Sequence, residues 1–147
     1  MRALAVETIA VADKISPVSQ GAGTVTSGWV SMARFTQLMA IVKTGVLGTS
    51  ATVDAKLQQA SDSGGTGAKD ITGKAITQLV KASNDNNQAV INLRPSDLDV
   101  ANGFSYVRLS VTVGTAASLI DGTLLGFIPV NAPASSVDSA GVVQIVN

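Results

Sequence analysis

Apolar and polar residues alternate with a period of two over several segments of the chain. Residues 106–113 carry aliphatic side chains at the odd positions and polar or tyrosine side chains at the even positions. Successive side chains of a strand point to opposite faces of its sheet, so this pattern predicts a strand with one buried face. The same pattern over residues 52–58 and 89–94 predicts two more strands, and Pro95 ends the second because it lacks a backbone N–H.

Two other runs are apolar at both odd-numbered and even-numbered positions. Residues 35–46 and 123–130 therefore fit central strands that are covered on both faces. Glycine within a helix costs about 1 kcal/mol relative to alanine, so the glycines in and beside these runs favour strand over helix. Further strands are expected within residues 4–11, 24–32 and 71–80.

Clusters of Gly, Ser, Asn and Asp separate these runs at fairly regular intervals, as turns do. About eight strands separated by such turns predict an all-β fold, a jelly-roll-like β-sandwich, for residues 21–131. Residues 1–20 and 132–147 are interpreted as extended N-terminal and C-terminal arms. The apolar parts of these arms fit burial against a neighbouring subunit, and an edge strand in the chain's own sheet is the alternative.

The composition removes most enzyme chemistry. The chain of 147 residues contains no histidine and no cysteine, so it lacks imidazole bases, thiolate nucleophiles, disulfides and the usual ligands of zinc and haem. We therefore expect no catalytic residue, no metal and no cofactor. Ten basic and ten acidic residues give a formal net charge of zero, which indicates no nucleic-acid partner. No run fits a membrane span or an export signal, so we expect no membrane partner and synthesis in the cytoplasm.

Candidate ligand loops fail on their spacing. The glycine-rich segment 67–75 has five residues between its glycines where a phosphate loop has four, and alanine stands where a hydroxyl must bind magnesium. Asp97 and Asp99 begin like a calcium loop, but the glycine comes one residue late and no glutamate follows. These residues are therefore interpreted as parts of turns. A weak ion site with oxygen ligands near Asp62 and Asp70 stays an open alternative, as does the role of the loop between them.

Residues for an interface with other subunits come from the apolar arms and from the rare aromatic side chains. Tryptophan is enriched among interface hot spots, but it is also a residue that folded proteins bury, so Trp29 fits either an anchor or the core. The candidate interface residues are Leu4, Val6, Ile9, Trp29, Val142, Val143 and Ile145.

Several segments together resemble one family of structural proteins. The resemblance is carried by residues 45–48, 51–60, 67–79, 96–99 and 104–111, and it covers roughly residues 24–130. In these segments the chain is similar to capsid decoration (cement) proteins of tailed phages. The resemblance implies a jelly-roll fold on the outer surface of an icosahedral head, with no catalytic signature. It also implies a location in the virion, the major capsid protein as partner, and self-association as a dimer or trimer.

Two other functions fit parts of the same pattern. A tail or neck component of the same phage modules would share the strand and turn patterns. A small carbohydrate-binding β-sandwich would need a patch of exposed aromatic side chains, and only 3% of the residues are aromatic. Because the usual general bases and nucleophile partners are absent from the chain, an enzyme is the least favoured interpretation.

Overall fold

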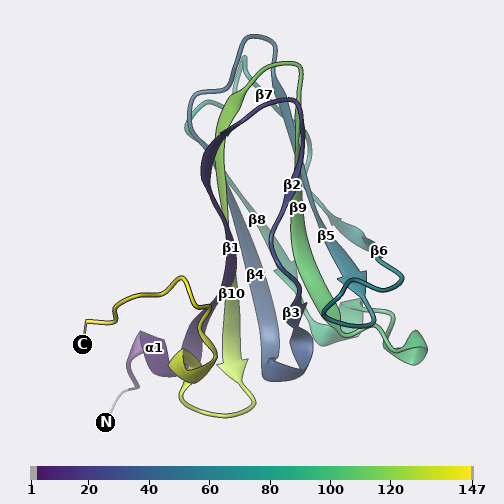
Figure 1. The fold of residues 1–147 in the computed structure, drawn as a ribbon, viewed down its shortest axis with the longest axis vertical. Coiled ribbons are helices and arrows are strands. Elements are labelled where there is room, and N and C mark those ends of the chain that lie inside the picture. The colour runs from purple at the N-terminus through teal and green to yellow at the C-terminus, as the bar shows by residue number, and fades with distance from the viewer. Residues whose placement is uncertain (1–2, 147) are drawn as a thin grey trace.

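Ten strands form two antiparallel sheets that face each other across the core (Figure 1). The computed structural model describes residues 3–146. The strands are β1 (Ile9–Gln20), β2 (Gly23–Thr26), β3 (Val30–Ser31), β4 (Phe35–Thr44), β5 (Thr52–Ala60), β6 (Lys69–Ala75), β7 (Leu79–Val80), β8 (Gln88–Leu93), β9 (Tyr106–Gly114) and β10 (Ser118–Pro129).

The strand order identifies the fold. Sheet A has the order β1-β10-β4-β8, and sheet B has the order β2-β9-β5-β6, with the short β3 paired to β9 and β7 to β5. All pairs are antiparallel. The eight longer strands thus divide four to each sheet, and most connections cross from one sheet to the other. This is a jelly roll, the double-sheet arrangement of two Greek keys. The predicted fold class is confirmed.

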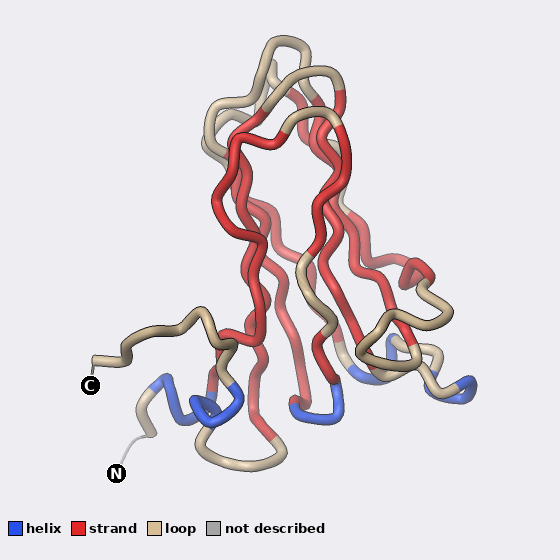
Figure 2. Tube along the Cα trace, in the orientation of Figure 1, coloured by secondary structure: helices blue, strands red, loops and turns tan. Residues whose placement is uncertain are grey.

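The helical segments are short, and all lie at one end of the sandwich (Figure 2). Both ends of the described chain also lie there (Figure 1). The opposite end is built from loops, of which residues 21–22 join β1 to β2. Among residues 3–146, no helix is long and apolar enough to cross a membrane. The helical segments are α1 (Ala5–Thr8), η1 (Met32–Arg34), η2 (Pro95–Asp97), η3 (Val100–Asn102) and η4 (Ala134–Val137).

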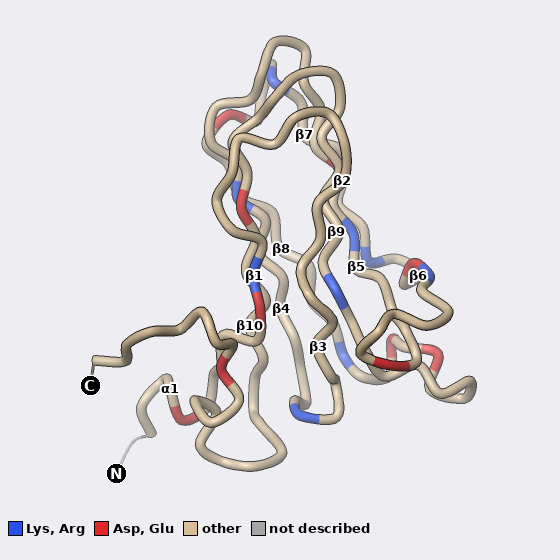
Figure 3. Tube along the Cα trace, in the orientation of Figure 1, with Lys and Arg blue, Asp and Glu red and all other residues tan. Residues whose placement is uncertain are grey.

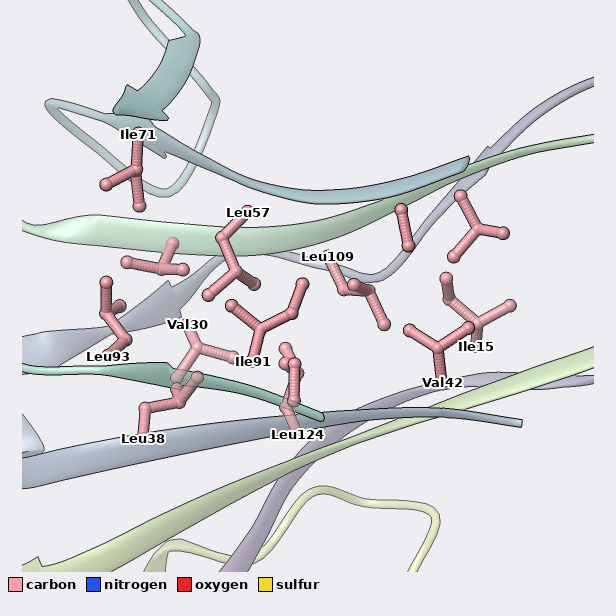
Figure 4. Packing of buried hydrophobic residues seen from close by; sticks show 14 of the residues in the cluster. Ile15, Val30, Leu38, Val42, Leu57, Ile71, Ile91, Leu93, Leu109 and Leu124 are labelled. Carbon is pink, nitrogen blue, oxygen red and sulfur yellow. The ribbon is translucent and has the colours of Figure 1, made fainter. Parts of the chain in front are cut away.

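The core lies between the inner faces of the two sheets (Figure 4). Leu57 and Leu109 of sheet B point toward Leu38 and Leu124 of sheet A, and none of these side chains is more than 1% exposed. Aliphatic side chains fill this layer because the chain has few aromatic ones. Their close packing holds the two sheets together.

Glycine has a packing role in β10. The buried ring of Phe35 lies over Gly126, where a Cβ atom would come within 2.4 Å of the ring. The absence of a side chain therefore lets a large aromatic residue enter the core. Gly126, which favours a strand in the sequence, is thus also required for the packing of Phe35.

The three alternating segments form strands as predicted. Residues 106–113 lie in β9, residues 52–58 lie in β5, and residues 89–93 lie in β8. Their aliphatic residues, among them Val53 and Leu93, are buried while the intervening positions are more exposed.

The two runs that are apolar at odd and even positions also form strands, β4 and β10. The prediction that both of their faces are covered is wrong. Each strand buries one face against sheet B, while outward residues such as Met39, Ile41 and Leu125 stay half-buried. The physical reason is that sheet A is an outer layer of a two-layer fold. The apolar residues on its outer face are therefore not part of the core between the sheets.

The two terminal segments differ from each other. Residues 9–20 are part of sheet A as an edge strand, because β1 pairs with β10 and sends Ala10 and Ile15 into the core. That placement matches the edge-strand alternative rather than a free arm. Residues 132–146 contain η4 but no strand.

Candidate docking surface

The outer faces of the two sheets differ in chemistry. On sheet B, outward polar side chains are bound to one another across the strands. Arg108 donates to Gln58 at 2.9 Å, Gln58 donates to Asp70 at 2.9 Å, and Lys56 reaches the same carboxylate at 2.8 Å. The donors Lys56 and Gln58 lower the pKa of Asp70, so this carboxylate is ionised at neutral pH. This face is a polar network suited to water.

The single tryptophan is held within this polar side. The guanidinium of Arg108 lies 4.6 Å from the centre of the Trp29 ring, a cation–π contact. Gly65 approaches the ring so closely that a Cβ atom there would lie 2.6 Å from Nε1. Trp29 also lines a shallow hollow with Ala12 and Val137. It is half-buried, so it serves local packing and does not form an open aromatic platform.

The outer face of sheet A is apolar instead. Cross-strand partners share a face, and the registers place Val11, Leu125 and Met39 in one row and Ile41 with Val90 in the next. The most exposed members are Val90, at 52%, and Leu119, at 47%. We call this surface the apolar face; it consists of Ile9, Val11, Met39, Ile41, Val90, Leu119, Leu125 and Phe127.

Little charge lies on the apolar face. β8 carries no charged residue, β4 and β10 carry Lys43 and Asp121, which pair at 3.4 Å, and β1 adds Lys14 opposite the outward Thr123 (Figure 3). The other carboxylate oxygen of Asp121, Oδ1, is buried without a hydrogen-bond partner in the described chain. Asp121 lines a hollow together with Pro17 and Leu119. The charges of Lys43 and Asp121 balance each other, and Lys14 donates to the hydroxyl of Ser16 at 2.7 Å.

Exposed apolar residues continue from this face around the end of β10. Ile128 adopts φ +50°, a conformation that is unfavourable for a β-branched residue, and its side chain is 58% exposed. Val130 is 63% exposed, although its N–H is bound to the carbonyl of Arg34 at 2.9 Å. Ile128 and Val130 therefore extend the exposed apolar surface past the end of β10.

The C-terminal segment is hydrogen-bonded to sheet A at Asp138 and Ser139, and the residues after position 142 are exposed. The N–H of Ser139 donates to the carbonyl of Val11 at 2.8 Å, and Asp138 accepts the N–H of Val11 at 2.8 Å. Ala134 is fully buried between these contacts and the core. Beyond them, Val143 is 95% exposed and the following apolar residues are also exposed. The chain therefore leaves the sandwich at the outer edge of β1.

The structure brings most of the proposed interface residues to one end of the molecule. α1, which contains Val6, contacts η4, and both ends of the described chain lie on the same side (Figure 1). Leu4 is half exposed, whereas Val6, Ile9 and Val142 are half-buried. Trp29 lies next to this group, since it lines a hollow with Val137 of η4, but its ring stacks with Arg108 of sheet B.

The sequence analysis missed the central part of the apolar face. The sequence did contain a sign of this face: β4 has apolar residues at both odd and even positions, for example Met39 beside the inward Leu38. That pattern indicates burial of both faces of the strand. Within the described chain, only the inner face is covered, by sheet B. The outer side of this pattern is left partly exposed to solvent.

The carboxylates considered as ion ligands are engaged in local hydrogen bonds. Asp62 accepts from the N–H groups of Gly64 and Thr66, and bonds from Thr66 lower its pKa most strongly. Asp99 is bound mainly by Lys69, which also lowers the pKa of that carboxyl. Within the described residues, no group of three or more His, Cys, Asp or Glu side chains is arranged to hold a metal ion.

Comparisons with known proteins find distant similarity in structure and none in sequence. No protein-family model matches the chain, and no curated protein matches its sequence. Among solved structures, a chain of Broad Bean Stain Virus is similar with a TM-score of 0.48 and 9% identity, over 85% of this chain and 88% of that one. A chain of infectious bursal disease virus strain Gx has a TM-score of 0.46 and 11% identity, over 86% and 33%.

A carbohydrate-binding domain is also similar, with a lower TM-score. The xylan-binding CBM22-1 domain of Xyn10C from Paenibacillus barcinonensis has a TM-score of 0.38 and 14% identity, over 85% of this chain and 86% of that domain. These scores are too low to carry a functional argument, and the neighbours come from unrelated classes of protein. The strand order by itself establishes that this chain is a jelly-roll β-sandwich.

Proposed function

We propose that this protein is a structural component of a virus particle, a decoration protein that binds the outer surface of a tailed-phage capsid. It stabilises the shell by bridging neighbouring subunits of the major capsid protein. The apolar face of sheet A is the observation that carries this proposal, and the resemblance of residues 24–130 to decoration proteins agrees with it. The protein acts by binding alone, without catalysis, metal or cofactor.

The apolar face has the properties of a docking surface. Monomeric proteins rarely leave a contiguous apolar sheet face open to water, and such a face indicates a contact with another macromolecule. Full burial of one Val or Leu side chain contributes roughly 1.5–3 kcal/mol. Val90 and Leu119 are about half exposed, so docking them recovers part of that amount. A modest contact of this kind becomes strong when many copies bind one closed shell.

The same features weaken the carbohydrate-binding alternative. Such a site presents aromatic rings to the sugar, whereas Trp29 is covered by Arg108, and Lys69 lies 4.1 Å from the centre of the Phe104 ring. Phe35 is buried in the core, and the two remaining aromatic residues, Tyr106 and Phe127, are half-buried in different sheets. A tail or neck component would use an apolar face equally well, and the experiment below distinguishes it.

The test is binding to heads that lack this protein. Purified protein is mixed with empty heads of the encoding phage, and bound protein is measured after sedimentation. Wild-type protein should bind at saturable stoichiometry and raise the temperature at which the heads open. Ile41→Lys and Leu125→Lys, on the apolar face, should weaken binding at least tenfold.

Thr24→Lys is the matched control, because it adds the same charge on the exposed polar face of sheet B. It should bind like the wild type. Equal binding of all the variants would exclude the apolar face as the docking surface. Absence of binding to heads, together with recovery of the protein in purified tails, would support the tail alternative.

A further inference from the structure

The edges of the two sheets are not equally protected against pairing with another chain. At the edge of sheet A, β1 contains Pro17, which has no N–H, and its Val11 is already bound to the C-terminal segment. In sheet B, β2 is only 4 residues long, and β6 contains charged residues and Gly73 at φ +75°. Short strands, proline, irregular backbone and charge are known devices that prevent edge pairing.

β8, the other edge of sheet A, has none of these devices. Its 6 residues, Gln88–Leu93, include no charge, no proline and no glycine. Their backbone pairs with β4 on one side, and no other backbone hydrogen bond to them is formed within the described chain. Gln88, Val90 and Asn92 are exposed. β8 is therefore a regular, open edge with unpaired N–H and C=O groups.

The C-terminal segment, residues 142–146, has the complementary properties. Val143 and Val146 are 95% and 82% exposed, which is extreme for aliphatic side chains. No backbone hydrogen bond joins residues 143–146 to the rest of the described chain. The segment is uncharged and rich in β-branched residues, which favour strands. It is a strand-forming sequence without a strand partner.

We propose that residues 142–146 of one copy add as an extra strand to β8 of a second copy. An added strand next to β8 would have one side on the apolar face beside Val90 and the other near Ile91, at the opening between the sheets. This explains why aliphatic residues occur at both parities of the segment. Its extended length, about 16 Å, also fits that of β8, about 20 Å.

The partner is a second copy because the chain's own segment cannot lie along β8. Ser139 is fixed at the edge of β1, and β8 is the opposite edge of the same sheet, about 14 Å away across three strand spacings. The three steps from Ser139 to Val142 span at most about 10 Å, and the N–H of Val142 folds back to Ser139 at 3.0 Å. In Figure 1 the C-terminal segment runs away from the sheet.

The exchange links different surfaces of two copies, the β1 side of the donor and the β8 side of the acceptor. Such head-to-tail contacts close into rings when the rotation permits, and sheet A then continues from one copy to the next. This inference gives a structural basis for the self-association expected from the sequence, and it rests on the proposed function only for its biological use. The pairing itself can be tested in the absence of heads.

The absence of native cysteine allows a direct test by disulfide cross-linking. Full-length Val90→Cys is mixed with a tagged, full-length partner carrying one cysteine at position 143, 144, 145 or 146. Opposite residues on one face of a sheet have Cβ atoms about 4.5–5.5 Å apart, close enough for a disulfide, whereas their neighbours point to the other face. Mild oxidation should therefore give mixed dimers in a yield that alternates along the four positions.

Thr24→Cys, on the exposed polar face, replaces Val90→Cys as the control and should give no mixed dimer above the level of collision. Protein that ends at residue 140 should sediment as a monomer where the full chain associates. Cross-links without alternation, cross-links equal to the Thr24 control, or an unchanged oligomer after truncation would each overturn the inference. Failure here with intact binding to heads would leave the proposed function standing, and the reverse result would leave the strand exchange standing.

Discussion

Leu109 in β9 packs directly onto Gly122 in β10, across the space between the two sheets. A Cβ atom on Gly122 would lie 2.6 Å from Cδ2 of Leu109 and 3.6 Å from the side chain of Ile15. Leu109 is fully buried. The glycine therefore forms the floor of the site that this leucine fills, and the two residues set the local distance between the sheets.

We predict that Leu109→Ala lowers the free energy of unfolding by about 2–5 kcal/mol, because it leaves a cavity in the core. Gly122→Ala should cost about 1–3 kcal/mol through overpacking. In the double variant the added methyl group occupies part of the cavity, so its loss should be smaller than the sum. Urea unfolding of all four proteins measures this coupling. Additive losses would show that the two residues do not share one site.

Arg108→Ala should destabilise the protein far less than Leu109→Ala. Arg108 is only partly buried, and its contacts are the Trp29 ring and Gln58 on the outer face. A cation–π contact of this kind contributes about 0.5–1 kcal/mol. The fluorescence of the single tryptophan should change in the folded state because its neighbour is lost. Equal losses for the two variants would mean that the assignment of the two faces of β9 is wrong.

Gly65→Ala should disturb the loop that covers Trp29. Gly65 has φ +86°, and an added Cβ atom would meet Nε1 of the ring at 2.6 Å. Both backbone strain and contact with the ring therefore oppose the substitution. We expect a lower unfolding midpoint and a red shift of tryptophan emission. Gly21→Ala, where no atom lies within 4 Å of the new Cβ, is the control and should change neither.

Stability should fall as the pH drops below 4. Lys81 and, next, the N–H of Leu47 bind the Asp85 carboxylate and lower its pKa from the ordinary value of 3.8. The unfolded chain therefore takes up this proton at a higher pH than the folded protein. The stabilisation is complete above the unfolded pKa and is lost as the pH falls through the folded pKa.

Asp85→Asn should remove part of that dependence, since an amide does not ionise in this range. Urea midpoints measured from pH 2.5 to 7 provide the readout. Lys81→Ala should reduce the slope in the same direction, because it removes the main cause of the pKa shift. If the slope of both variants matched that of the wild type, Asp85 would not contribute to acid unfolding.

Chelation should leave the protein unchanged. The carboxylates of Asp62 and Asp70 are bound by groups of the chain itself, namely amides and the side chains of Thr66, Lys56 and Gln58. The melting temperature should therefore be the same with and without EDTA, and with added calcium. A shift of several degrees would reveal an ion site, and Asp62→Asn and Asp70→Asn would then locate it.

Much of the fold could be predicted from local patterns. Alternation places Val53 and Leu109 inward with little ambiguity, because the two faces of their strands differ in chemistry. Alternation cannot say which strands become neighbours. The contact of Ser139 with Val11, for example, depends on a register between distant segments, and neither residue carries a local signal for it.

The candidate surface was harder to predict for a different reason. Met39 and Leu125 have the same residue types as the core, so a second buried face and an uncovered docking face give one pattern in the sequence. Only the position of their sheet as an outer layer separates the two explanations. Trp29, in contrast, attracted interest because of its residue type, and its partners Arg108 and Gly65 became visible only in the fold.

The separation of the chain termini from the loops at the other end has a practical consequence. The turn at Gly21 and Ala22 lies far from the end that holds η4 and the C-terminal segment (Figure 1), and both residues are exposed. Neither the apolar face nor β8 includes this turn. A foreign peptide inserted there would leave β8 and most of the apolar face intact, since only Leu119, which pairs with Ser19, lies near the turn. Under the proposed function, a decorated head would carry the peptide in many copies. The molecule is thus a candidate scaffold for displaying antigens on a particle surface.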